Sequence, residues 1–117
     1  MRTLVNPLAE ISHQSATAAA NTAVAITLPA DPEQCHVVCR VDWSYDGAPT
    51  GGKVTITAGS TTLRELHIVE GGPGLMDWYK DLNNPGIHND DTKGEAVTVT
   101  LTAGGASVVG TLGLSWM

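Results

Sequence analysis

The sequence contains no phenylalanine, and its large aromatic side chains are limited to three tryptophans and two tyrosines. Yet 42% of its 117 residues are hydrophobic, many of them alanine, valine and leucine. The core must therefore be built mainly from small aliphatic side chains, which bury a modest area per residue. Association with further copies of the chain would bury additional area, so we expect self-association.

Positive charge is scarce, because six lysines and arginines stand against twelve acidic residues and give a formal net charge of −6. The six cations are scattered along the chain as Arg2, Arg40, Lys53, Arg64, Lys80 and Lys93. Proteins that bind nucleic acids carry clustered cations, which displace counterions from the phosphates. The sequence therefore predicts no nucleic-acid partner.

Long hydrophobic runs are also missing. No stretch approaches the ~20 apolar residues that a membrane-spanning helix requires, so we expect no membrane partner. Near the N-terminus, Asn6, Pro7 and Glu10 interrupt the apolar run that a secretion signal needs. We expect a protein that is synthesised in a cytoplasm and either stays there or leaves by a route without a cleaved leader.

Cysteine is limited to Cys35 and Cys39. On an extended strand four residues place their Cα atoms about 13 Å apart, too far for a disulfide. We expect two buried thiols that behave as small apolar residues. The alternative is a metal site built from Cys35, His36 and Cys39, but no second Cys/His cluster completes four ligands.

Catalytic motifs are absent as well. There is no GxSxG nucleophile turn and no HExxH metal motif. Glu65 and Glu70 lie five residues apart and would face opposite sides of a strand, which argues against a glycosidase pair. Asp90 and Asp91 offer oxygen ligands for Ca²⁺, but such residues are common in turns. We expect no enzyme, no catalytic residue, no metal and no cofactor.

What the sequence does contain is a series of strand signals. Residues 97–102 and 108–116 alternate apolar and polar side chains on either side of Gly104-Gly105, which predicts a β-hairpin. Val97, Val99 and Leu101 share one face of the first arm. Leu112, Leu114 and Trp116 share one face of the second arm.

Further strands are expected upstream, each bounded by turn residues. The expected ranges are 22–28, 34–45, 53–58, 61–69, 75–79 and a short strand near Leu82 or Ile87. Val37, Cys39, Val41, Trp43 and Tyr45 should share the inner face of residues 34–45. Gly59-Ser60 predicts a tight hairpin between two of these strands. Residues 61–69 break the alternation, which indicates either a bulge or a strand covered on both faces.

Eight strands without a substantial helix predict an all-β protein, an eight-stranded antiparallel jelly-roll sandwich over residues 21–117. Residues 1–20 are small, polar and uncharged in their second half, and we expect an N-terminal arm there. Asn6 and Pro7 would cap a short helix with Leu4, Leu8 and Ile11 on one side. The alternative is an extended arm that lies on a neighbouring subunit.

The motifs TAVAITLPA, V-x-W-S-Y, GAPTGGKVTITAG, GGPG and VTVTLTAGGASVVGTLGLSW follow one another between residues 22 and 116. This string resembles the small jelly-roll proteins of tailed bacteriophages that act as capsid decoration (cement) proteins or as heads of short fibres. The resemblance is a pattern of strands and glycine turns, and it contains no catalytic signature.

The resemblance implies a structural virion protein on the capsid exterior, which binds the major capsid protein and forms a homotrimer, with a dimer as the alternative. The N-terminal arm would then contact the capsid or the neighbouring subunit. The residues expected to make that contact are Arg2, Leu4, Val5, Leu8 and Ile11.

Trp78 and Tyr79 form the candidate contact for another partner, because exposed aromatic rings anchor protein interfaces and stack on sugars. The simpler interpretation is that one ring covers the open end of the core. The alternative function is a receptor- or carbohydrate-binding module of a phage fibre or tail. Its ligand would touch the loops at residues 71–79 and 83–94.

Overall fold

A computed structural model describes residues 11–31, 36–68, 72–79, 86–88 and 94–117. Within these ranges the protein contains strands and no helix, which confirms the predicted all-β class. The strands are β1 (Ser12–Thr17), β2 (Val24–Leu28), β3 (Val37–Tyr45), β4 (Gly52–Ala58), β5 (Thr61–Ile68), β6 (Gly74–Asp77), β7 (Ile87–His88), β8 (Val97–Leu101) and β9 (Gly110–Trp116).

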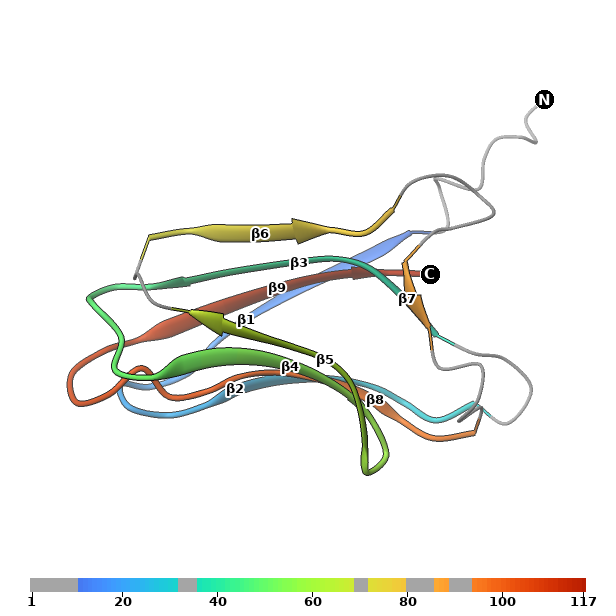
Figure 1. The fold of residues 1–117 in the computed structure, drawn as a ribbon, viewed down its shortest axis with the longest axis horizontal. Coiled ribbons are helices and arrows are strands. Elements are labelled where there is room, and N and C mark those ends of the chain that lie inside the picture. Colours follow the sequence, from blue (N-terminus) through green and yellow to red (C-terminus); the bar gives the residue numbers. More distant parts are fainter. Residues whose placement is uncertain (1–10, 32–35, 69–71, 80–85, 89–93) are drawn as a thin grey trace.

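The strands form two antiparallel sheets that pack face to face (Figure 1). Sheet A has the order β1-β9-β3-β6, and the short β7 also pairs with β3. Sheet B has the order β2-β8-β4-β5. Setting β7 aside, four strands face four strands, and the chain crosses between the sheets after β1, β2, β3, β5, β6 and β8, whereas β4 and β5 are consecutive in sheet B. This arrangement is consistent with the predicted jelly roll.

The core lies between the sheets and consists almost entirely of aliphatic side chains. Every second residue of β2, β4 and β8 is buried, because successive strand residues project to opposite faces. The largest fully buried side chains are Ile26, Ile56, Leu101, Leu112, Leu114, Val38, Val41, Val54, Val97 and Val99. The apolar faces predicted for β8 and β9 are therefore confirmed, with Trp116 partly buried against the core.

The predicted C-terminal hairpin is wrong. β8 pairs with β2 and β4 in sheet B, whereas β9 pairs with β1 and β3 in sheet A. The chain crosses from one sheet to the other around Gly104 and Gly105. Both strands turn their apolar faces to the same core, so the alternation looks the same for a hairpin and for a crossing between sheets.

The predicted hairpin of β4 and β5 is confirmed, with Ala58 paired to Thr61 across Gly59 and Ser60. Gly59 adopts a φ of +58°, a conformation that glycine reaches without steric cost. Within the hairpin the register shifts, because Thr57 pairs with Thr62 and Ile56 pairs with Arg64. Leu63 is the extra residue of a bulge. This bulge explains why apolar and polar side chains do not alternate regularly along β5.

The N-terminal segment differs from the expected arm. Residues 12–17 form β1, which pairs with β9 along its whole length at the edge of sheet A. β1 carries almost no apolar side chains, so it lacked a strand signal, and main-chain hydrogen bonds hold it in the sheet. Only Ala16 of this strand packs against the core. Residues 1–10 lie outside the described residues.

Candidate ligand-binding cleft

A row of polar side chains crosses the outer face of sheet A. His13 pairs with Ser115, Ser115 pairs with Arg40, and Arg40 pairs with Asp77, so each strand contributes one residue. His13 Nδ1 and Ser115 Oγ share a hydrogen bond of 3.0 Å. An Arg40 amino group lies 3.2 Å from an Asp77 carboxylate oxygen. Register alone therefore brings together four residues that are far apart in the sequence.

A bulge in β3 adds a fifth side chain to this face. Val38 pairs with Trp116 and Arg40 pairs with Ser115, which leaves Cys39 as the extra residue. Such a bulge lets two successive residues occupy the place of one. Val38 enters the core, whereas Cys39 is buried outside the core cluster. The prediction that Val37 and Cys39 face the core is therefore wrong. It assumed that side chains alternate regularly along the strand, and an inserted residue reverses that order.

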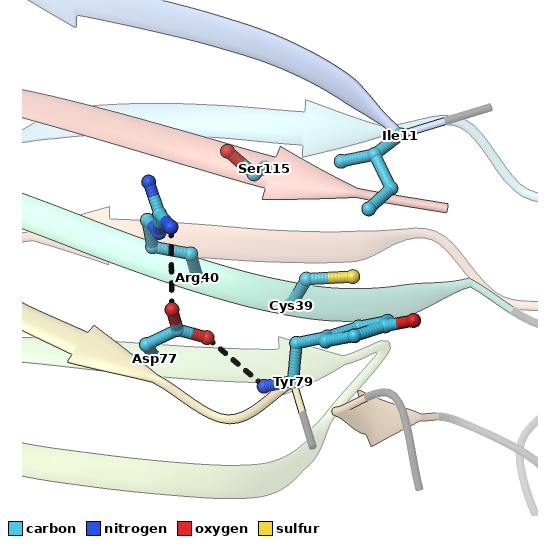
Figure 2. A pocket seen from close by; sticks show the side chains of 6 residues that line it. All are labelled: Ile11, Cys39, Arg40, Asp77, Tyr79 and Ser115. Carbon is cyan, nitrogen blue, oxygen red and sulfur yellow. Dashed lines mark hydrogen bonds and ion pairs between the residues drawn. The ribbon is translucent and has the colours of Figure 1, made fainter. Parts of the chain in front are cut away.

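Except for His13, these side chains line an open cleft of about 230 Å³ (Figure 2). Its walls are Ile11, Cys39, Arg40, Asp77, Tyr79 and Ser115. Asp77 lies between two of the others: one carboxylate oxygen accepts from Arg40, and the other accepts from the Tyr79 main-chain N–H at 3.0 Å. The Trp78 N–H donates to the Cys39 carbonyl at 2.8 Å, which holds the segment after β6 against β3.

The electrostatics of the cleft keep the Cys39 thiol protonated. Burial raises the pKa of this thiol, the Asp77 carboxylate raises it further, and Arg40 opposes both. The thiolate is the reactive form of cysteine, so the site suppresses nucleophilic and redox chemistry at this residue. The Arg40–Asp77 pair is about half exposed and contributes less than about 1 kcal/mol to stability.

The metal site considered for Cys35, His36 and Cys39 gains no support from the described members. His36 donates from Nε2 to the Pro29 carbonyl at 2.6 Å, while Cys39 lines the cleft. Cys35 lies outside the described residues. Across the described ranges, no three histidine, cysteine, aspartate or glutamate side chains are grouped to hold a metal ion.

The residues singled out from the sequence are distributed as follows. Arg2, Leu4, Val5 and Leu8 lie outside the described residues, as do Asp90 and Asp91. Ile11 is described and forms part of the cleft wall.

The two neighbouring aromatics have separate environments. Trp78 is partly buried and packs against the core. Tyr79 lines the cleft on the other face of sheet A.

Sequence analysis did not identify Arg40, Asp77 and Ser115 as members of one site. Arg40 and Asp77 are 37 residues apart, and their contact requires that β6 pair with β3 in one register. The only local signal was Asp77 directly before the aromatic pair. The bulge at Cys39 adds this side chain to the cleft wall. The alternation of apolar and polar residues in the sequence does not reveal the bulge.

Comparisons with known proteins add no relative: neither a protein-family model nor a curated protein matches the chain. Among the described residues no helix is long and apolar enough to cross a membrane. The cleft and the two-sheet sandwich are therefore the features on which a function can be argued.

Proposed function

We propose that the protein is a structural component of a tailed-bacteriophage virion, which decorates the capsid exterior as a homo-oligomer and binds the major capsid protein. A homotrimer is the assembly that the sequence resemblance favours, with a dimer as the alternative. The observation that carries the proposal is the strand order of the sandwich, four strands facing four in an arrangement consistent with a jelly roll. The phage proteins that the sequence resembles are small jelly rolls as well.

Self-association is supported by an edge strand of sheet A. Within the part of the chain that the structure describes, β6 pairs with β3 and with no strand on its other side. Leu75 and Met76 on this strand are 56% and 36% exposed, and they are the exposed large hydrophobic residues of the described chain. Burying them against another subunit would be favourable at about 25 cal/mol per Å².

The main chain of β6 also has groups to offer a partner. In an antiparallel ladder, residue pairs that are hydrogen-bonded to each other alternate with pairs that are not. The Trp78 N–H donates to the Cys39 carbonyl, so the next pair, Arg40 and Asp77, is of the second kind. Leu75 and Asp77 therefore direct their N–H and C=O groups away from β3. An exposed strand edge of this kind accepts a strand from another chain.

Attachment to the capsid falls to the N-terminal residues in this proposal. Arg2, Leu4, Val5 and Leu8 precede β1, which is hydrogen-bonded to β9 over six residue pairs. A pull on these residues is thus transmitted directly into sheet A. Ile11, the first described residue, would be the last contact of the attachment.

The proposal is tested with purified capsid shells that lack the protein. The full chain should cosediment with the shells and raise the temperature at which they fail, whereas a variant without residues 2–10 should remain folded and stay in the supernatant. Light scattering at micromolar concentration should report an oligomer. A monomeric full chain that leaves shells unbound would contradict the proposal.

The contribution of β6 is tested by the variant Leu75→Ser/Met76→Ser. We expect a smaller oligomer, because the apolar contact at the edge is lost. The matched control is Thr61→Ser/Thr62→Ser, which alters two exposed residues on β5, the edge strand of sheet B.

A further inference from the structure

We propose that the cleft on sheet A binds one neutral pyranose ring of a carbohydrate. Its volume of about 230 Å³ is smaller than the ~300–1,000 Å³ of sites for drug-sized ligands. A single sugar ring suits a cleft of this size better than a larger ligand does, and the open mouth leaves room for a glycan chain to continue into solvent.

The walls of the cleft separate into an apolar side and a polar side. Ile11, Cys39 and the ring of Tyr79 are apolar, while Arg40, Asp77 and Ser115 present hydrogen-bonding groups. A sugar ring has the same division, with C–H groups on its faces and hydroxyls around its rim. Tyrosine is suited to such a ligand because its ring offers a large flat contact surface.

The charges in the cleft favour a neutral ligand. The charges of Arg40 and Asp77 neutralise each other, because an Arg40 amino group lies 3.2 Å from an Asp77 carboxylate oxygen. An anionic ligand would draw Arg40 away and leave the Asp77 carboxylate without its cation, and a cationic ligand would do the reverse. A hydroxyl pair leaves both charges matched, because one hydroxyl donates to the carboxylate and its neighbour accepts from the guanidinium. Guanidinium and carboxylate groups make the stronger class of hydrogen bonds.

The polar groups are also held in place before a ligand arrives. Both oxygens of Asp77 are oriented, one by Arg40 and one by the main chain of Tyr79. The Ser115 hydroxyl is oriented by His13. Figure 2 shows the Tyr79 ring beside Cys39, with its hydroxyl pointing away from Arg40 and Asp77. Pre-oriented groups lower the entropic cost of binding.

This inference goes beyond the proposed virion role, which requires no sugar. Ile11 and β6 take part in both proposals, whereas Arg40 and Ser115 of the cleft have no role in the proposed capsid attachment. The outcomes stay distinguishable, because capsid binding is measured on shells without sugar and sugar binding is measured on the free chain without shells.

The test is a titration of the full chain with sugars, in which ¹H–¹⁵N NMR spectra recorded at each step report binding. The probes are the methyl glycosides of glucose, galactose, mannose and N-acetylglucosamine, and the charged comparison is glucuronic acid. At least one neutral glycoside should shift the amide signals of Arg40, Asp77, Tyr79 and Ser115 and saturate with a millimolar Kd, as expected of a small ligand with few contacts.

Three variants and one matched control separate binding from general effects. Tyr79→Ala and Asp77→Asn should each weaken the sugar about tenfold or more, the equivalent of one strong contact. Tyr79→Phe should bind as the native chain does, since the hydroxyl points away from Arg40 and Asp77. The control Glu65→Gln should also bind normally: Glu65 forms an ion pair with Lys53 on sheet B, and its side chain is 42% exposed, as is that of Asp77.

Several results would overturn the inference. One is the absence of saturable shifts with every neutral glycoside at concentrations far above a millimolar Kd. A second is binding of glucuronic acid alone, because the site would then select an anion. A third is binding that survives Tyr79→Ala, or that shifts amides on other faces of the sandwich.

Discussion

The phenolic hydroxyl of Tyr45 donates a hydrogen bond to the main-chain carbonyl of Thr102 at 2.7 Å. Tyr45 ends β3 in sheet A, while Thr102 directly follows β8 in sheet B. The bond thus joins the two sheets at the end of the sandwich where the chain crosses between them. The Tyr45 ring is buried beside Gly52, Gly104 and Gly110, which leave room for it.

We therefore expect Tyr45→Phe to lower the free energy of unfolding by about 1 kcal/mol, because the Thr102 carbonyl loses its donor. Tyr45→Ala should cost about 3–5 kcal/mol, since it also leaves a cavity. Urea denaturation followed by circular dichroism measures both. Equal stability of Tyr45→Phe and the native chain would show that the hydrogen bond contributes nothing.

A second prediction concerns alkaline pH. Burial raises the pKa of Tyr45, so the unfolded chain loses this proton at a lower pH than the folded chain does. The free energy of unfolding should be insensitive to this group below the ordinary tyrosine pKa of about 10 and should fall as the pH rises above it. Tyr45→Phe should show a smaller fall over the same range. A fall of the same size in both proteins would assign the effect to other groups.

The close approach of β6 to β3 yields a third prediction. A Cβ atom added at Gly74 would collide with the indole ring of Trp43. Gly74→Ala should therefore destabilise the fold by about 1–3 kcal/mol, the usual cost of overpacking. Gly72→Ala is the matched control, because a Cβ there meets no atom within 4 Å. If both variants unfold at the same urea concentration, the packing of Gly74 against Trp43 is not tight.

A fourth prediction addresses the thiol in the cleft. In a Cys35→Ser background, Cys39 should react with iodoacetamide at least about tenfold more slowly than the same thiol in the unfolded chain, because it is buried and protonated. Asp77→Asn should move the pH–rate profile toward lower pH, since the carboxylate helps to raise the pKa of the thiol. A profile that stays in place would contradict the role of Asp77.

A fifth prediction tests the crossing of the chain between the sheets. Thr98 lies opposite Thr27 of β2, with 3.2 Å between their hydroxyl oxygens. In a Cys35→Ser/Cys39→Ser background, Thr27→Cys/Thr98→Cys should form a disulfide on oxidation. The comparison is Thr98→Cys/Thr111→Cys, whose residues would face each other in the hairpin expected from the sequence. A disulfide in the second variant and none in the first would contradict the pairing of β8 with β2 and support a hairpin of β8 and β9.

Much of the sandwich was predictable because a strand buried on one face imposes a period of two on its residues. β2, β4 and β8 carry that pattern in full, and the apolar residues expected on one face of β8 lie in the core. β1 could not be found in this way. Its place at a sheet edge depends on main-chain hydrogen bonds to β9, which do not depend on side-chain type.

The cleft was less accessible to prediction. Tyr79 and Ile11 were identified beforehand, one as an exposed aromatic and the other as part of an arm. Their meeting beside Arg40, Asp77 and Ser115 rests on strand pairings that span up to 104 residues of sequence, the separation of Ser12 and Trp116. The bulge at Cys39 then sets which side chains reach the outer face.

The amino-acid sequence alone determined the all-β class, the aliphatic core and the position of most strands, because the alternation of apolar and polar residues shows which face of a strand is buried. Only the tertiary structure decided which strands are neighbours, that β8 and β9 belong to different sheets, and that four scattered polar residues form one row. Pairing is a relation between distant main-chain segments, and local composition carries little information about it.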